Sequence, residues 1–265
     1  MRQPMITLTT DFGLSDHFAA AMKGVILGIE PRARIVDITH DIAPFAITEA
    51  AFVLAEAARC FPPETVHVVV VDPGVGTSRR PILVHAAGQY FVAPDNGVLS
   101  LIYARERHRV RAITAERFFR QPVSRTFHGR DIFAPVAAHL ARGVPPPRFG
   151  KLISDYARGD FAAPTPHGPR RWTGRVLKVD RFGNLITNFA VEDFPALESS
   201  PFNVKAGRRR VTQCVRSYAE GPPGGLILIA GSSGFLEVAA NLASAAKLTG
   251  CKAGAVIRLT APSKD

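Results

Sequence analysis

The sequence of 265 residues is poor in cysteine and has no long hydrophobic run. Its three cysteines, Cys60, Cys214 and Cys251, are an odd number without C-x-x-C spacing, so we expect reduced thiols rather than disulfides or a zinc site. No apolar run approaches the ~18 residues that a membrane span requires, so no membrane partner is expected. The first residues lack the apolar core and cleavage site of a signal peptide, and we therefore expect a cytoplasmic protein.

Acidic residues are scarce relative to basic ones: 22 Asp and Glu face 33 Lys and Arg, which gives a net charge of +11. Such an excess often indicates a nucleic-acid partner. The basic runs, however, are short and scattered, and they lack the interleaved aromatic residues that stack on bases. We interpret the charge as an arginine-rich solvated surface and expect no nucleic-acid partner. A basic nucleic-acid-binding protein remains an alternative.

Residues 1–143 alternate strand-like and helix-like segments, which predicts an α/β domain with a mostly parallel sheet flanked by helices. Apolar residues recur at helical spacing over 18–29 and 48–61. Residues 66–71 are almost wholly apolar, as in a strand covered on both faces. Segments 82–87 and 89–93 are expected to pair across the Gly88 turn, and a last helix is expected over 131–143 with Asp131 as its N-cap.

The character of the chain changes after residue 143. Residues 144–171 are rich in proline and glycine and show no clear period, which predicts a linker. From Trp172 to residue 265, short strand-like segments are separated by turn residues. This pattern predicts a small C-terminal all-β barrel domain. The expected organisation is therefore a domain over 1–143, a linker over 144–171 and a domain over 172–265.

Polar residues follow several of the predicted strands. In an α/β sheet, ligands bind at the carboxyl ends of the strands, so these residues are expected along one rim. Each one alone could be a helix cap or turn former. Their convergence on one rim indicates a functional site more strongly. His128 lies just before the last predicted helix. The residues that follow strands are Asp11, Asp37, His40, Asp41, Asp72, Asp95 and Asn96.

The loop DPGVGTSRRP (72–81) is a poor candidate for a phosphate cradle. It contains G-x-G but lacks the third glycine of the dinucleotide fingerprint and the G-K-[ST] of a Walker loop, and no helix is predicted after Pro81 to bind an anion. It places Asp72 and Arg79 on a tight loop, free to face each other. A metal-dependent phosphohydrolase built on Asp and His ligands remains an alternative, although no H-x-H or H-E-x-x-H spacing occurs.

Seven motifs follow one another along nearly the whole chain: TTDFG (9–13), ITHDI (38–42), VDPGVGTSRRP (71–81), PDNG (94–97), FHGRDIFAP (127–135), DRFGNLITN (180–188) and GSSGFLEVAAN (231–241). As an ordered set they resemble the SAM hydroxide adenosyltransferase family, which are adenosine-forming S-adenosyl-L-methionine (SAM) hydrolases related to the SAM-dependent chlorinase and fluorinase. The resemblance implies an α/β domain joined to a β-barrel, in a homotrimer with active sites between subunits. It implies SAM as the substrate, with no metal and no organic cofactor.

The resemblance also implies roles for individual residues. Water attacks the ribose C5′ of SAM and methionine leaves, and the family's water-activating set corresponds to Asp72, Arg79 and His128. The family's spacing from Asp72 to Arg79 implies that Arg80 is the solvated one of the two arginines. The substrate-binding positions of the family correspond to Asp11 at the ribose hydroxyls, Asp16 and Asp180 near the methionine end, Phe45 and Phe182 around adenosine, Asn184 and the backbone near Ala240 at adenine, and Ser232 and Glu237 at the methionine carboxylate and amino groups.

A chlorinase-like, SAM-dependent halogenase is the alternative within the family. The fluorinase-like pattern has a tyrosine where this chain has Asp72, and hydroxyl-bearing residues where it has Val75. A carboxylate beside the line of attack repels a halide but helps to activate water. No long insertion separates the PDNG and FHGRD motifs. Hydrolysis is therefore the expected reaction. Because SAM is a cation, the overall positive charge gives no clue to function.

Overall fold

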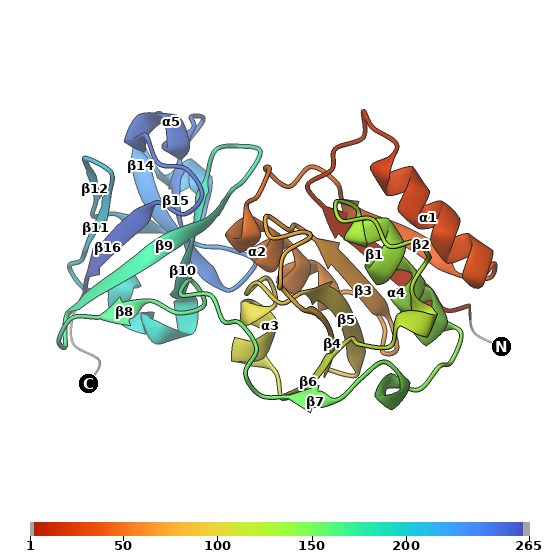
Figure 1. The fold of residues 1–265 in the computed structure, drawn as a ribbon. Coiled ribbons are helices and arrows are strands. Elements are labelled where there is room, and N and C mark those ends of the chain that lie inside the picture. The colour runs from red at the N-terminus through yellow and green to blue at the C-terminus, as the bar shows by residue number, and fades with distance from the viewer. Residues whose placement is uncertain (1–2, 262–265) are drawn as a thin grey trace. The chain divides into compact units, whose positions relative to one another are not determined.

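The computed structural model describes residues 3–261, and the chain divides into two compact units, Met1–Gly159 and Asp160–Asp265 (Figure 1). The division falls inside the proline- and glycine-rich segment 144–171. The part of that segment before the division packs on the first unit, where the Gly159 amide donates to Ser100 Oγ at 2.7 Å. Each unit has its own hydrophobic core.

The first unit contains a seven-stranded sheet in the order β2-β1-β3-β5-β4-β6-β7. In this order the neighbours from β2 to β5 pair in parallel, and the neighbours from β5 to β7 pair antiparallel. The sheet is therefore mixed, where the sequence predicted a mostly parallel one, because the hairpin across Gly88 reverses the chain and the later strands add to that edge. The strands are β1 (Met5–Thr10), β2 (Arg34–Thr39), β3 (Val66–Val70), β4 (Pro81–Ala86), β5 (Gln89–Pro94), β6 (His108–Ala112) and β7 (Leu152–Ile153).

Helices cover both faces of this sheet. Helices α1 (Phe18–Ile29) and α4 (Ala134–Ala141) pack against each other on one face, and α2 (Ile47–Ala58) and α3 (Ser100–Arg105) pack on the other (Figure 1). Every residue of β3 is buried, which confirms the prediction of a strand covered on both sides. Within the described residues, no helix is long and apolar enough to cross a membrane.

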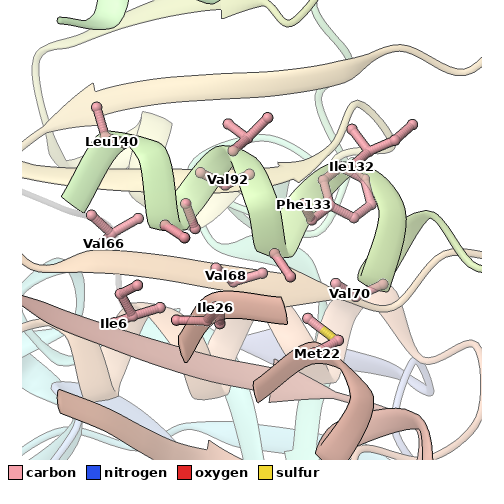
Figure 2. Close-up of a cluster of buried hydrophobic side chains, with 14 of the residues drawn as sticks. Ile6, Met22, Ile26, Val66, Val68, Val70, Val92, Ile132, Phe133 and Leu140 are labelled. Atoms are coloured by element: carbon pink, nitrogen blue, oxygen red, sulfur yellow. The ribbon is translucent and has the colours of Figure 1, made fainter. Parts of the chain in front are cut away.

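The alternation of side chains along β3 explains this burial. Val66, Val68 and Val70 point toward α1 and α4, where they meet Ile26 and Phe133 (Figure 2). The residues between them point the other way: the His67 ring stacks on Phe91 and meets the edge of Phe61, which follows α2. Because successive residues of a strand face opposite sides, a strand packed between two helical layers is apolar at nearly every position. The first polar residue after it is Asp72.

Helix α4 begins differently from the prediction. A π-helical turn, Gly129–Phe133, precedes it, and Asp131 lies fully buried inside this turn. The Asp131 carboxylate accepts from the amide of Ser124 at 2.9 Å and from the Arg130 guanidinium at 2.7 and 2.9 Å. The prediction of Asp131 as an N-cap is therefore wrong, because its oxygens bind an upstream loop instead of the helix amides. The turn carries His128 at its start.

The second unit is a curled sheet of nine strands, β8 (Thr165–Pro166), β9 (Arg171–Val179), β10 (Leu185–Ala190), β11 (Asn203–Ala206), β12 (Arg209–Val211), β13 (Cys214–Val215), β14 (Leu226–Ala230), β15 (Phe235–Ala240) and β16 (Val256–Thr260). Eight of them follow the path β12-β11-β16-β9-β10-β15-β14-β13, and β8 pairs with β9. Within residues 160–261 the two end strands do not pair, so the predicted barrel is only half closed. The short helix α5 (Ala245–Thr249) packs against β15.

Candidate active site

The polar residues that follow the strands of the first unit gather at one edge of its sheet. Asp11, Asp72 and Asp95 follow β1, β3 and β5, which are neighbours and run parallel. The carboxyl ends of these three strands therefore meet at the same edge of the sheet, as expected for an α/β sheet. A pocket of 330 Å³ opens there, and its lining includes Asp11 and Asp72 as well as Phe45 and His128. This volume lies in the range of small-molecule sites.

Arg79 is in direct contact with both Asp72 and His128. The Arg79 side chain donates from Nε to Asp72 Oδ1 at 3.1 Å and from Nη2 to Asp72 Oδ2. The same Nη2 donates to His128 Nδ1 at 3.1 Å. Only 4% of the Asp72 side chain and 7% of the Arg79 side chain are exposed. Charge-assisted, bidentate pairs of this kind are strong and geometrically specific, so the loop presents a fixed set of charges.

The loop that carries Asp72 and Arg79 is held in a tight turn. The Val75 amide donates to the carbonyl of Asp72, and the Thr77 hydroxyl donates to the carbonyl of Gly74. Gly76 has a φ of 78°, and a Cβ there would lie 2.4 Å from the carbonyl oxygen of Arg125. Only glycine fits this position. Strand β4 begins at Pro81, so no helix follows to bind a phosphate, as the sequence predicted.

The contact with Arg79 decides which ring nitrogen of His128 carries the proton. A guanidinium has only donors, so His128 Nδ1 must accept the bond. Burial lowers the pKa of His128, and the charge of Arg79 lowers it further. The imidazole is therefore neutral near pH 7 and holds its hydrogen on Nε2. In this state His128 can orient an oxygen by donating to it, whereas its acceptor nitrogen is already occupied.

The guanidinium of Arg79 keeps unused capacity to donate. Its Nη1 is buried and has no hydrogen-bond partner among the described residues. The guanidinium carbon lies 5.3 Å from the centre of the Phe133 ring, which supports the cation from one side. A buried donor without an acceptor is costly and calls for a functional explanation. Arg79 therefore concentrates positive charge beside Asp72 and His128.

Asp11 is tied to a strained residue that also lines the pocket. Its Oδ2 accepts from the amide of Phe45 at 2.9 Å. Phe45 has a φ of 67°, an unfavourable conformation for a large side chain, and 70% of the residue is exposed. Strain of this kind costs about 1–3 kcal/mol and clusters at binding sites. The pocket also has an aromatic wall of three rings, Phe12, Phe18 and Phe127, which were not predicted as binding residues. Phe12 and Phe127 lie within two of the motifs, whereas Phe18 fits the apolar face of α1.

The other predicted substrate-binding residues do not line this pocket. Asp16 is exposed in the loop before α1. In the second unit, Asp180, Phe182 and Asn184 share one turn. Asp180 Oδ1 accepts from the amides of Phe182 and Asn184 at 2.9 and 2.8 Å, and its Oδ2 accepts from Asn184 Nδ2 at 2.8 Å. The turn leaves the Phe182 ring 79% exposed.

Glu237 on β15 forms a second polar group in the same unit. The hydroxyl of Tyr218 donates to Glu237 Oε2 at 3.2 Å. Burial raises the pKa of Glu237, and the nearby charge of Asp180 acts in the same direction. Ser232 is exposed in the turn before β15, and Ala240 is buried at the end of this strand. Tyr218 was not predicted, since it lies far from Glu237 in sequence and in a segment without a recognisable motif.

The residues considered as metal ligands have other partners. His40 Nδ1 lies 2.8 Å from Thr10 Oγ1, and its Nε2 lies 3.1 Å from Asp37 Oδ1. The other oxygen of Asp37 accepts from Lys23 at 2.5 Å. Over residues 3–261, no three His, Cys, Asp or Glu side chains are placed to hold a metal ion. The histidine therefore links β2 to the end of β1.

Comparison with known proteins settles the family. The family model for the SAM hydroxide adenosyltransferase N-terminal domain matches residues 6–150, and the model for the C-terminal domain of the same family matches residues 174–258. The chain belongs to the SAM hydroxide adenosyltransferase family. The resemblance carried by the seven motifs is thereby confirmed.

Relatives inside and outside the SAM hydroxide adenosyltransferase family align with nearly the whole chain. The (R)-S-adenosyl-L-methionine hydrolase of Salinispora arenicola is 39% identical over 97% of this chain and 98% of that protein. The fluorinase of Actinopolyspora mzabensis is 26% identical over 97% of each. Among solved structures, an uncharacterized conserved protein from Thermotoga maritima has a TM-score of 0.84 at 38% identity, over 97% of this chain and 99% of that one.

Proposed function

We propose that this protein hydrolyses SAM to adenosine and L-methionine. The observation that carries the proposal is the contact of Asp72, Arg79 and His128 at a pocket that also contains Asp11. Family membership supports it, and so does the name of the Salinispora relative, which specifies the (R) configuration at sulfur. We therefore assign (R)-SAM as the substrate. The sulfonium is already an activated leaving group, so the reaction as proposed needs neither a metal nor an organic cofactor.

In the proposed mechanism the protein acts on the nucleophile, because water is a poor nucleophile at neutral pH. His128 donates from Nε2 to the water oxygen and aims it at C5′, in line with the departing sulfur and at roughly 3 Å. Asp72, a carboxylate that lines the same pocket, takes up the proton as the new C–O bond forms. Arg79 holds both side chains and stabilises the negative charge that develops on oxygen.

We assign Asp11 to the two ribose hydroxyls, because one carboxylate can accept from two neighbouring donors. Replacing Asp11 with alanine is expected to raise KM for SAM by about 10- to 100-fold and to change kcat by less than about threefold, since the lost bonds are present before and during the reaction. Steady-state kinetics with (R)-SAM measures both constants. A lower kcat at unchanged KM would instead place Asp11 in the chemical step.

The proposal extends to the second unit and to the assembly. Carboxylates suit the ammonium and sulfonium groups of SAM, so we place the methionine end near Asp180 and Glu237, with Asp16. We place the adenosine near Phe182, Asn184 and Ala240, and the methionine carboxylate near Ser232. The family resemblance further implies a homotrimer, and light scattering of the purified protein would measure its mass.

A SAM-dependent halogenase is the second candidate, favoured by the similarity to fluorinases. The lining of the pocket argues against it. Val75 offers no hydroxyl to a halide, and Asp72 places a carboxylate in the same pocket. A fixed negative charge opposes the entry of an anion, whereas it assists the removal of a proton from water. Hydrolysis is therefore the better supported reaction.

The proposal is tested by incubating the protein with (R)-SAM and, separately, with the (S) epimer, each with and without chloride, followed by chromatography of the products. We expect adenosine and methionine in equal amounts from (R)-SAM, independent of chloride. Formation of 5′-chloro-5′-deoxyadenosine would show a halogenase. If neither epimer gives a product, the proposed function is wrong.

A further inference from the structure

One turn binds both ends of the loop that carries Asp72 and Arg79. It is formed by Asp95 and Asn96, directly after β5. Asn96 Nδ2 donates to the carbonyl of Val71 at 2.9 Å. Val71 is the residue immediately before Asp72, so this bond fixes the point at which the loop begins.

The other end of the loop is fixed by Asp95. Its Oδ2 accepts from Arg80 Nε at 3.2 Å and Arg80 Nη2 at 2.8 Å, and its amide donates to the carbonyl of Arg80 at 2.9 Å. Arg80 is the residue immediately after Arg79. The backbone on both sides of the Asp72–Arg79 pair is therefore held by two adjacent residues of a neighbouring strand end.

We propose that Asp95 and Asn96 are positioning residues that set the geometry of the Asp72–Arg79–His128 contact. This inference rests on the proposed hydrolysis. Neither residue lines the pocket, so their effect passes through the loop. Placing a water in line with C5′ demands precise geometry, and a misplacement of about 1 Å can cost 10²-fold in rate.

Arg80 is the link through which Asp95 acts. The family's spacing predicted Arg80 as the solvated one of the two arginines, and it is the more exposed of them. Arg80 is 36% exposed, against 7% for Arg79, but its guanidinium is fully engaged. In addition to Asp95, Nη1 donates to both carboxylate oxygens of Asp155 at 3.0 and 3.1 Å, and Nη2 donates to its carbonyl at 2.8 Å.

Burial distinguishes the two carboxylates that hold Arg80. The Asp95 side chain is 5% exposed, and its Oδ1 also accepts from the amide of Ala157 at 2.7 Å. The Asp155 side chain is 74% exposed. Exposed ion pairs contribute little, whereas shielded charge-assisted bonds are strong. The inner pair with Asp95 therefore fixes Arg80, and the outer pair with Asp155 adds a minor contribution.

The first test compares Asn96→Ala and Arg80→Lys with wild type in (R)-SAM hydrolysis. Lysine keeps the charge but cannot reach Asp95 with two bonds. We expect kcat to fall about 10- to 100-fold in both variants, with KM within about twofold. Two controls are matched to Arg80→Lys. Asp155→Ala should lower kcat by less than about threefold. Arg105→Lys, which alters the ion pair with Glu56 between α3 and α2, should leave kcat unchanged.

The second test separates positioning from general stability. Asn96→Ala is combined with Arg79→Ala, and the residual rate is measured by long incubations with mass-spectrometric detection. If Asn96 acts through Arg79, the loss caused by Asn96→Ala shrinks to less than about twofold in the Arg79→Ala background, because coupled residues are not additive. An equal loss in both backgrounds would overturn the inference.

Folding and the proposed function are monitored separately. Circular dichroism and thermal unfolding show whether each variant is folded, and the partly exposed Arg80→Lys serves if Asn96→Ala does not fold. Wild-type kcat in a folded Arg80→Lys or Asn96→Ala variant would refute the positioning role and leave the hydrolysis intact. No adenosine from the wild-type protein would instead refute the proposed function.

Discussion

Replacing Arg79 with alanine is expected to lower kcat for (R)-SAM hydrolysis by about 10²- to 10³-fold and to change KM by less than about threefold. The side chain holds Asp72 through two bonds and His128 through a third. In the proposed mechanism its charge lies where hydroxide develops. Its loss therefore removes stabilisation that the transition state needs more than bound SAM does. Steady-state formation of adenosine, measured over a range of SAM concentrations, gives both constants.

Two further variants make this result specific to Arg79. Arg79→Lys keeps a positive charge but cannot bind Asp72 and His128 together in the same geometry, so its kcat should lie between those of wild type and Arg79→Ala. Arg105→Ala, on α3, should leave kcat unchanged. If Arg79→Ala keeps the wild-type kcat and only raises KM, Arg79 binds substrate and does not assist the water.

The activity is expected to fall at acid pH with a midpoint below the ordinary pKa of histidine. Burial and the charge of Arg79 lower the pKa of His128 from 6.5. The proposed mechanism needs the neutral ring of His128. Protonation would place a hydrogen on Nδ1, and this hydrogen would point at the N–H donor of Arg79. As the pH falls, kcat should therefore decline with a midpoint below 6.5, where His128 takes up a proton. A profile of kcat against pH measures this midpoint.

Variants at both positions test the cause of the shift. In Arg79→Ala the repulsion between the two cations disappears, so the midpoint should move up toward 6.5. His128→Ala should lower kcat by about 10²-fold or more, whereas His128→Gln keeps an N–H donor and should retain part of the activity. An acid limb centred above 6.5 in wild type, or full activity of His128→Ala, would contradict the role of a neutral His128 donor.

The pattern of β3 shows what could be predicted locally. Its almost wholly apolar run indicates a strand between two helical layers, and the carboxylate after it then falls at the carboxyl edge of the sheet. The same rule places Asp11 and Asp95 at that edge. The contact of the loop with His128 could not be derived this way, because it joins residues far apart in sequence. It followed only from the ordered motifs of the family.

Other features depend on tertiary contacts that no local pattern records. Asp131 has the residue type of a helix cap, but its oxygens bind Arg130 and the amide of Ser124 inside a π-helical turn. Arg80 is the more exposed of the two arginines, as the family's spacing implied, yet Asp95 and Asp155 bind it from different segments. Beyond the predicted hairpin across Gly88, the antiparallel pairing of β6 and β7 had the same origin, since a strand pattern does not specify the direction of its neighbour.

The central claim is that a water molecule attacks the ribose C5′ and methionine departs intact. Hydrolysis of (R)-SAM in ¹⁸O-labelled water, followed by mass spectrometry of both products, tests it directly. The account predicts one ¹⁸O atom in adenosine, at its 5′-hydroxyl, and none in methionine. Adenosine without the label would show that its 5′ oxygen does not come from water and would contradict the account.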